Sequence, residues 1–525
     1  MNLEGTKGSA FRFAAFVGEI VRVIGHVDRE RPLNDYCAGL LVAEGRRSVE
    51  PIAAVTAPRE VPAQHQRLLH FVANAPWSDA AVLAKVRELI LPVIERHGPI
   101  EAWIVDDTSF PKCGSKSVGV HHQYCGQLGK QANCQVAVTL SVANHHASLP
   151  IAYRLYLPQE WAEDARRRKK ARIPREISFK TKPEIALEQI RQAIAAGVPQ
   201  GTVLTDASYG SNSAFRAGVS ALGLKYVAAI IPTVMVRSVI DDGELGPRLS
   251  VKTLALGLPK KAWRTITWRE GTNKKLRSRF ARVQVRTAPI RGAAARGEET
   301  LLIEWPKGEP EPTKYWLSTL DKDIAFCGLV DRAKMRWRVE RDYLELKQEI
   351  GLGHYEGRGW PGFHHHATLC IAVYGFLISE REAIPPSGSH CAWRVKKPAI
   401  PDSYRSRGAS DPTSTSRSQL DRYAPSSVDG RDRKDTPKMS FIVQADTKAT
   451  CVGFCDAVQL AADLAPRDRA RNPPWAVVQM PRTTSPNLKA HRKRRLRDCS
   501  SCRQKRLRWS RQQPEPASAL VRVRR

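Results

Sequence analysis

The stretch AWIVDD at residues 102–107 decides the fold, because it joins a buried strand directly to two acidic residues. Four apolar residues in succession are typical of a strand that is covered on both faces, and an acid at its end is hard to explain as ordinary surface. A second run of this kind, TVLTD at 202–206, ends in Asp206. If the two strands lie side by side in one sheet, Asp106 and Asp206 come close together.

A third acid, Glu340, lies in RWRVERDYLELK (336–347), whose spacing predicts a helix. Arg336, Glu340 and Lys347 fall on one face of that helix, displaced from its apolar stripe. Taken alone, Arg336 and Glu340 are a surface ion pair worth about 0.2–0.5 kcal/mol. Together with the two strand-end aspartates, they predict a site where carboxylates hold two hard divalent cations, as in enzymes that cut and join phosphodiesters.

The charge of the chain favours a polyanionic partner. Its 525 residues hold 84 Lys and Arg against 52 Asp and Glu, a formal net charge of +32. Residues 381–525 are the most basic part, with 31 Lys and Arg against 13 Asp and Glu. A footprint of this sign and size indicates nucleic acid. No apolar run approaches the roughly 18 residues of a membrane span. The N-terminus has no signal-peptide pattern, so the 11 cysteines are interpreted as reduced thiols in the cytoplasm.

The hydrophobic pattern divides the chain into five segments. Residues 1–98 have helical spacing and predict a small helical domain, with DNA binding and simple packing equally open. Residues 99–231 and 321–386 form two parts of one catalytic domain, and the second part carries the Glu340 helix. Residues 232–320 between them contain short strand candidates and predict an all-β insertion. Residues 387–525 lose periodicity and are expected to be a basic, mostly disordered tail.

The catalytic segments predict a mixed α/β sheet with an antiparallel edge. Strands are expected at 102–106, 135–143, 149–157, 202–206 and 225–231, with helices at 183–195 and 213–222. In a sheet of this order the first and fourth strands can be neighbours. A single helix is expected over 324–350, with an apolar stripe made by Val339, Tyr343, Leu346 and Ile350.

These segments together resemble the DDE-superfamily transposases of bacterial insertion sequences, in the branch with a YREK-type signature. That signature is Tyr, two residues, Arg, three residues, Glu, six residues, Lys. Arg336, Glu340 and Lys347 match it at the right spacing, and Ala333 stands where the tyrosine would be. IVDDTSFPKCG resembles the first-aspartate motif of the family and LTDASYG resembles the second. The family tyrosine helps to bind a terminal phosphate, so Ala333 puts that contact in question.

The resemblance implies a ribonuclease H-like domain with a β insertion before the glutamate. It implies that Asp106, Asp206 and Glu340 bind two Mg²⁺ ions, which Mn²⁺ could replace. Asp107 competes with Asp106, but Asp106 directly ends the apolar strand, while Asp107 points to the other face. One ion would activate water and the other would stabilise the leaving 3′ oxygen, after which the freed 3′-OH attacks target DNA.

The resemblance also implies the partners of the protein. These are double-stranded DNA, as transposon terminal inverted repeats and as target, with a homodimer acting in the cytoplasm at the nucleoid. Arg336 and Lys347 would contact phosphates. Further contacts are predicted for the basic run ARRRKKAR at 165–172, interpreted as a loop along the DNA backbone. The predicted contacts besides Arg336 and Lys347 are Lys112, Arg166, Arg167, Arg168, Lys169 and Lys170.

Two other functions stay open on the sequence. One is a ribonuclease H-like nuclease that cuts without strand transfer. The other is a decayed DNA-binding remnant, which Ala333 and the atypical tail keep under consideration. The run His364–His366 is interpreted as structural or DNA-facing, since adjacent helical residues point in different directions and cannot share one metal.

Overall fold

The N-terminal segment is helical, as predicted. The computed structural model describes residues 8–240, 244–270, 275–287 and 297–383. Ser78 caps the last helix of this segment by accepting a hydrogen bond from the Ala81 amide at 3.1 Å. This helix contains Pro92 and continues to Glu95. The helices are α1 (Ser9–Ile24), α2 (Glu30–Val42), α3 (Val49–Thr56), α4 (Val61–Ala73) and α5 (Asp79–Glu95).

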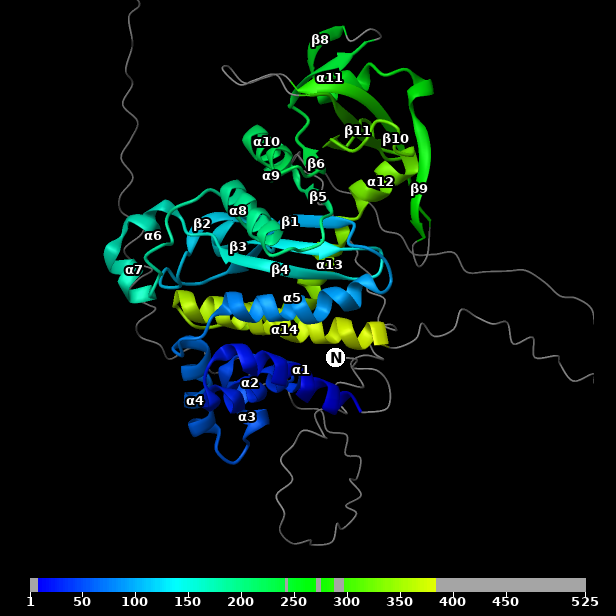
Figure 1. The fold of residues 1–525 in the computed structure, drawn as a ribbon. Coiled ribbons are helices and arrows are strands. Elements are labelled where there is room, and N and C mark those ends of the chain that lie inside the picture. Colours follow the sequence, from blue (N-terminus) through cyan, green and yellow to red (C-terminus); the bar gives the residue numbers. More distant parts are fainter. Residues whose placement is uncertain (1–7, 241–243, 271–274, 288–296, 384–525) are drawn as a thin grey trace, which may run out of the picture. The chain divides into compact units, whose positions relative to one another are not determined.

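A mixed sheet forms the centre of the described structure and confirms the α/β class (Figure 1). Its order in the described residues is β2-β3-β1-β5-β6-β12-β11-β10-β7-β8, with β4 paired to β3 and β9 paired to β10. The strands that follow the helical segment are β1 (Ala102–Pro111), β2 (His121–Cys125), β3 (Lys130–Ala143), β4 (Ser148–Leu155), β5 (Thr202–Thr205) and β6 (Tyr226–Ile230).

The apolar run AWIV places β1 inside the sheet. Its four residues are fully buried, and β1 pairs antiparallel with β3 and parallel with β5. The predicted adjacency of the first and fourth strands is therefore confirmed. Val105 is the register partner of Thr205, so the residue that follows each of them is an aspartate.

Between β4 and β6 the chain forms five helices besides β5. They are α6 (Gln159–Glu163), α7 (Ala165–Ala171), α8 (Lys182–Ala195), α9 (Ala207–Gly210) and α10 (Ser213–Ala221).

The segment predicted as an all-β insertion extends the central sheet. β12 pairs antiparallel with β6, so the strands after residue 232 continue from the same hydrogen-bonded edge. The all-β description is wrong, because α11 (Val251–Leu256) lies within this segment. Its strands are β7 (Met235–Val239), β8 (Leu245–Ser250), β9 (Arg264–Glu270), β10 (Lys275–Thr287), β11 (Glu299–Trp305) and β12 (Lys314–Ser318).

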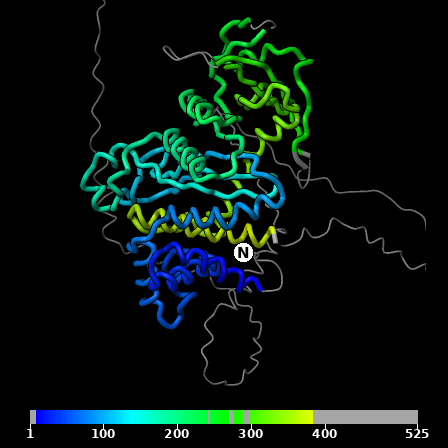
Figure 2. Tube along the Cα trace, in the orientation of Figure 1, coloured from blue at the N-terminus to red at the C-terminus, as the bar shows by residue number. Residues whose placement is uncertain are grey.

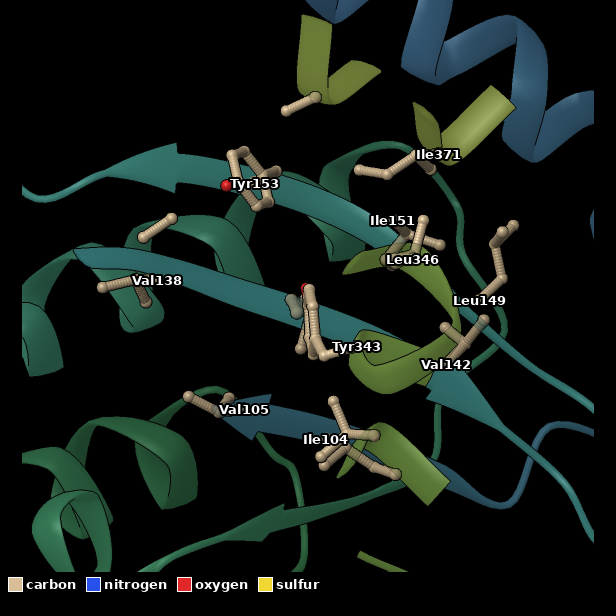
Figure 3. Close-up of a cluster of buried hydrophobic side chains, with 14 of the residues drawn as sticks. Ile104, Val105, Val138, Val142, Leu149, Ile151, Tyr153, Tyr343, Leu346 and Ile371 are labelled. Carbon is tan, nitrogen blue, oxygen red and sulfur yellow. The ribbon is translucent and has the colours of Figure 1, made fainter. Parts of the chain in front are cut away.

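The helix predicted over 324–350 is interrupted. It consists of α12 (Phe326–Lys334), α13 (Trp337–Glu345) and a π-helical turn, Leu346–Ile350. The predicted apolar stripe is confirmed, since its four residues are all buried. Figure 3 shows Tyr343 and Leu346 among side chains of the sheet. The sheet residues labelled there are Ile104, Val105, Val138, Val142, Leu149, Ile151 and Tyr153.

The last described helix, α14 (Trp360–Ala383), returns beside α5 (Figures 1 and 2). Its three adjacent histidines, His364–His366, are buried and hydrogen-bonded within the protein, which confirms the structural interpretation. None of the helices in the described ranges has the length and apolar character needed to cross a bilayer. The predicted tail, 387–525, lies outside the described residues.

Candidate active site

The two aspartates lie next to each other where the pairing of β1 with β5 ends. The predicted strand end at residue 106 is wrong, because β1 continues through Asp106 to Pro111, whereas β5 ends at Thr205, directly before Asp206. Asp106 follows Val105 on β1, and Asp206 follows Thr205 on β5, the strand paired with it. Asp206 is also the N-cap of α9, and its Oδ1 accepts from the Ser208 amide at 3.0 Å and the Ser208 hydroxyl at 2.7 Å. These bonds fix the orientation of the carboxylate at the point where the strand turns into a helix.

Arg336 links the first aspartate to Glu340. It is the N-cap residue of α13, and its guanidinium lies 2.6 Å from Asp106 Oδ2 and 2.5 Å from Glu340 Oε1. The Glu340 side chain is 62% exposed and the Asp106 side chain 16%, so the arginine connects a buried acid to one at the surface. The break between α12 and α13 places Arg336 at the start of a helix that approaches β1.

The electrostatics of Arg336 place all three acids around it. Burial acts to lower its pKa, but the charges of Asp106, Glu340 and Asp206 together raise it above the ordinary value. Burial raises the pKa of Asp106 to about 6; Arg336 acts against this shift and Asp206 adds to it. The charges of all three acids predicted from sequence therefore act on Arg336, which contacts Asp106 and Glu340 directly.

Lys347 approaches the same strand from the π-helical turn. Its Nζ donates to the Ser109 carbonyl at 2.8 Å and lies 5.0 Å from the centre of the Phe110 ring. Burial lowers the pKa of Lys347 to about 8, although the charges of Cys125 and Asp106 act in the opposite direction. Lys347 thus lies beside β1 beyond Asp106, and its contacts differ from those of Arg336 and Glu340.

Asp107 has a separate set of partners. Its Oδ2 accepts from Lys182 Nζ at 2.7 Å, and its Oδ1 accepts from the Tyr209 hydroxyl. Burial and the charge of Asp107 raise the pKa of Tyr209 well above its ordinary value. Sequence reasoning missed both partners, although Tyr209 belongs to the LTDASYG segment that was singled out for Asp206.

The acid cluster fits divalent cations in donor chemistry. Carboxylate oxygens are the ligands that Mg²⁺ prefers, and a buried acid whose pKa is raised by desolvation is stabilised by a nearby cation. In this structure the Arg336 guanidinium supplies that positive charge. In the described residues, no group of three or more His, Cys, Asp or Glu side chains is arranged to hold a metal.

The basic run at 165–172 is a helix, so its interpretation as a loop is wrong. Asp164 caps α7 by accepting from the Arg167 amide at 2.9 Å, which stabilises a helical start. Arg168 is taken up inside the fold, where its guanidinium donates to the carbonyls of Ile177 at 2.7 Å and Pro174 at 2.8 Å. The other cations of α7 are exposed at its surface: Arg166, Arg167, Lys169 and Lys170. Figure 1 shows α7 well separated from α13.

Two further sequence expectations concern residues away from the acids. Lys112 is half-buried and donates to the Tyr355 carbonyl at 3.1 Å, and burial followed by the charge of Arg46 lowers its pKa. Ala333 is buried in α12, one turn before Arg336. The structure does not bring Lys112 together with the three acids.

Two buried ion pairs that sequence reasoning missed connect the site to β11. Lys334, two residues before Arg336, lies 2.5 Å from Glu304 Oε2. Arg216 Nε lies 3.6 Å from Glu299 Oε1, and another nitrogen of Arg216 donates to the Gly210 carbonyl at 2.5 Å, at the end of α9. The available signal was a strand, ETLLIEW, with a glutamate at each side of its apolar centre.

The fold and the site define a mixed α/β protein with converging carboxylates at one sheet edge. The chain is similar to the DDE superfamily of endonucleases. A family model described as DDE superfamily endonuclease matches residues 19–275, which include Asp106 and Asp206. A probable transposase for insertion sequence element IS701 from Microchaete diplosiphon is 34% identical over 166 residues. That alignment covers 31% of this chain and 40% of the relative, so the chain spans less than half of the relative's length.

A solved structure gives a weaker likeness. The NurA nuclease from Sulfolobus solfataricus aligns with 50% of this chain and 75% of its own, at 9% identity and a TM-score of 0.21. A likeness at this level does not establish a shared fold.

Proposed function

We propose that this protein is an insertion-sequence transposase that cuts the ends of its element and joins them to target DNA. The observation that carries the proposal is the double contact of Arg336 with Asp106 and Glu340, beside Asp206. Similarity to the DDE superfamily and to a probable transposase supports the same function. The strand order, with the two aspartates on neighbouring parallel strands, supports a ribonuclease H-like fold.

Asp106, Asp206 and Glu340 are the residues that would hold two Mg²⁺ ions. When bound, such ions supply an activated water and stabilise the leaving oxygen of a phosphodiester. Asp106 is favoured over Asp107 because it contacts Arg336, whereas Asp107 is bonded to Lys182 and Tyr209. The serine bonds to Asp206 and the helix that carries Glu340 orient these acids from two different elements.

Arg336 and Lys347 would bind phosphates of the DNA. Arg336 is suited to this role because a guanidinium can contact two oxygens of one phosphate at once. On binding DNA, Arg336 would exchange one of its two carboxylate partners for a phosphate oxygen of the substrate. Lys347 has a pKa near 8 and remains mostly protonated at neutral pH, so it would offer a positive charge close to β1.

The proposed partner is double-stranded DNA, as the terminal inverted repeats of the element and as target. The net charge of +32 supports this partner, and the exposed cations of α7 would add salt-dependent contacts. We propose further that two copies act together across paired ends at the nucleoid. Inverted repeats bracketing the coding region would support the assignment independently.

A strand-transfer assay tests the function. The full chain is incubated with labelled DNA carrying the element's own ends, a target plasmid and Mg²⁺ or Mn²⁺. Joined product is expected, and Asp106→Asn and Glu340→Gln should abolish both cutting and joining. Cutting without joining would instead support the nuclease, and DNA binding without either product would support the decayed remnant. Cleavage that persists in both variants would refute the assignment of the acids.

A further inference from the structure

A small cavity adjoins the face of α13 that lies opposite Glu340. Its volume is about 180 Å³, and its walls come from α13, the end of α14 and the turn between β3 and β4. Asp342, which lines it, follows Glu340 by two residues, and successive residues of a helix are separated by about 100°. The cavity is therefore distinct from the acid cluster, although the same helix borders both.

Asp342 gives the cavity a buried hydrogen-bond acceptor. The residue is 3% exposed, and its Oδ1 accepts from the Ser148 hydroxyl at 2.7 Å and the Tyr374 hydroxyl at 2.9 Å. Its Oδ2 is buried and has no hydrogen-bond partner within the part of the chain that is described. Leaving such an acceptor unsatisfied costs about 1–3 kcal/mol, so a donor entering the cavity would be favoured here.

The rim of the cavity carries positively charged hydrogen-bond donors. Arg341 and Arg381 line the cavity, with side chains 54% and 44% exposed. Both are oriented by Glu345, at 3.0 Å from Arg341 and 2.9 Å from Arg381. Each guanidinium has five N–H donors and a fixed planar geometry, which suits phosphate oxygens. The cavity thus has a carboxylate acceptor inside and two arginines at its exposed edge, while the other carboxylate in its lining, Glu382, is paired with His97 at 2.8 Å.

The remaining wall favours a flat ligand. Trp337 and Tyr374 are among the lining residues, and aromatic side chains bind the faces of planar rings. Pockets that enclose drug-sized ligands have volumes of roughly 300–1,000 Å³, so this cavity would accept only a group about as large as one ring system. A planar base inside, with an anionic group left at the rim, matches all of these features.

We infer that this cavity binds a nucleotide, with a base that bears an exocyclic amino group directed at Asp342 and its phosphate at Arg341 and Arg381. The same chemistry is available from a free mononucleotide and from an unpaired nucleotide of a DNA strand. Because the cavity uses none of the three acids, the inference does not depend on the proposed cleavage reaction.

The first test measures mononucleotide binding. The full chain is titrated calorimetrically with dAMP, dCMP, dGMP and TMP in EDTA, which keeps divalent cations out of the acid cluster. The three nucleotides with an exocyclic amino group are expected to bind more tightly than TMP, whose base offers only a ring N3–H between two carbonyls. Equal affinity for all four would overturn the proposed role of Asp342.

Asp342→Asn is expected to change which nucleotide binds more tightly, and this change is more specific than a loss of binding. The asparagine oxygen can keep the bonds to Ser148 and Tyr374, while its NH₂ replaces the unpartnered oxygen. The preference should then invert between dAMP and TMP, so that TMP binds better than dAMP, whose base has no carbonyl. A merely structural role for Asp342 would weaken all four alike, and that result would also refute the inference.

Arg381→Gln tests the phosphate contact without touching the buried acid. It should weaken all four nucleotides about tenfold, as expected for the loss of one charge-assisted contact. Arg22→Gln is the matched control, since Arg22 is 71% exposed on α1 and pairs with Glu19. Equal affinities of the Arg381 and Arg22 variants would contradict the assigned phosphate position.

The source of the nucleotide is resolved with DNA. A duplex with one unpaired nucleotide and a fully paired duplex of equal length are compared in EDTA. Tighter binding of the former, abolished by Arg381→Gln, assigns the cavity to DNA. Mononucleotide binding without that advantage assigns it to a free nucleotide. If neither the mononucleotides nor the unpaired position binds, the inference fails, whatever the result of the strand-transfer assay.

Discussion

Lys334 should be the cation whose removal most destabilises the region around the proposed site. Its Nζ lies 2.5 Å from Glu304 Oε2 and 4.5 Å from the centre of the Trp268 ring, and the side chains of Lys334 and Glu304 are 13% and 5% exposed. Removing one partner of a buried pair costs about 3–5 kcal/mol, because the other charge is left unpaired in a poor solvent. We expect Lys334→Met to lower the free energy of unfolding by about 3 kcal/mol.

The exposed pair Lys252–Glu311 provides a matched control. Its atoms are 2.7 Å apart, but its side chains are 41% and 47% exposed, so Lys252→Met should cost less than about 1 kcal/mol. Replacing both members of the buried pair, as Lys334→Met with Glu304→Leu, should recover most of the loss, since no buried charge then remains. Urea denaturation followed by tryptophan fluorescence gives these values, and with Glu304→Leu alone as a fourth variant it completes the double-mutant cycle that gives the coupling.

Two results would refute this reasoning. One is a loss of unfolding free energy for Lys334→Met that is no greater than the loss for Lys252→Met. The other is a coupling energy below about 0.5 kcal/mol, which is the deviation from additivity seen for independent sites. Since Lys334 precedes Arg336 by two residues, the single variant should also reduce strand cleavage more than it reduces DNA affinity.

Three further predictions concern the cations at and near the site. Arg336→Lys should reduce cleavage at least tenfold, because an ammonium cannot make both carboxylate contacts of the guanidinium; unchanged cleavage would contradict its bridging role. Lys347→Met should stabilise the fold at pH 7, because burial lowers the pKa of Lys347 to about 8 and so makes the charged amine unfavourable in the folded state. Denaturation should show the full gain in unfolding free energy below pH 8, and the gain should disappear as the pH rises through the pKa of the unfolded chain. Arg168→Ala should lower the free energy of unfolding by about 2–3 kcal/mol in a denaturant titration, because its contacts with two carbonyls are lost. Arg166→Ala should change the free energy of unfolding by no more than about 0.5 kcal/mol and should instead lower the salt dependence of DNA binding.

The central strands could be predicted because their sequence signal is strong. AWIV and TVLT are typical of strands that are covered on both faces, and an aspartate directly follows the last residue of each strand in the β1–β5 pairing. β2 was missed for the opposite reason: it alternates between partly buried and exposed residues, so HHQYC carries little apolar signal. The break before Arg336 was missed because the apolar spacing runs through it without interruption, and only the start of a new helix reveals it.

The buried charges were not predictable, because each is explained only by its partner. Glu299 and Glu304 stand in a strand whose residues are almost all buried, which sequence reasoning interprets as a place for apolar side chains. Arg216 and Lys334, which neutralise them, are distant in the sequence and look like ordinary surface cations on helices. The local pattern therefore gives the strand correctly and leaves out the contacts that connect it to the site.

Those contacts give β11 a specific role in the geometry of the proposed site. One end of the strand, at Glu299, holds Arg216, which in turn holds the Gly210 carbonyl at the end of the helix that Asp206 caps. The other end, at Glu304, holds Lys334, just before the helix with Arg336 and Glu340. A strand has a nearly fixed rise of about 3.3 Å per residue, so it sets the separation of its two anchors. The segment between the second aspartate and the glutamate thus positions both acids through buried charges, in addition to connecting them along the chain.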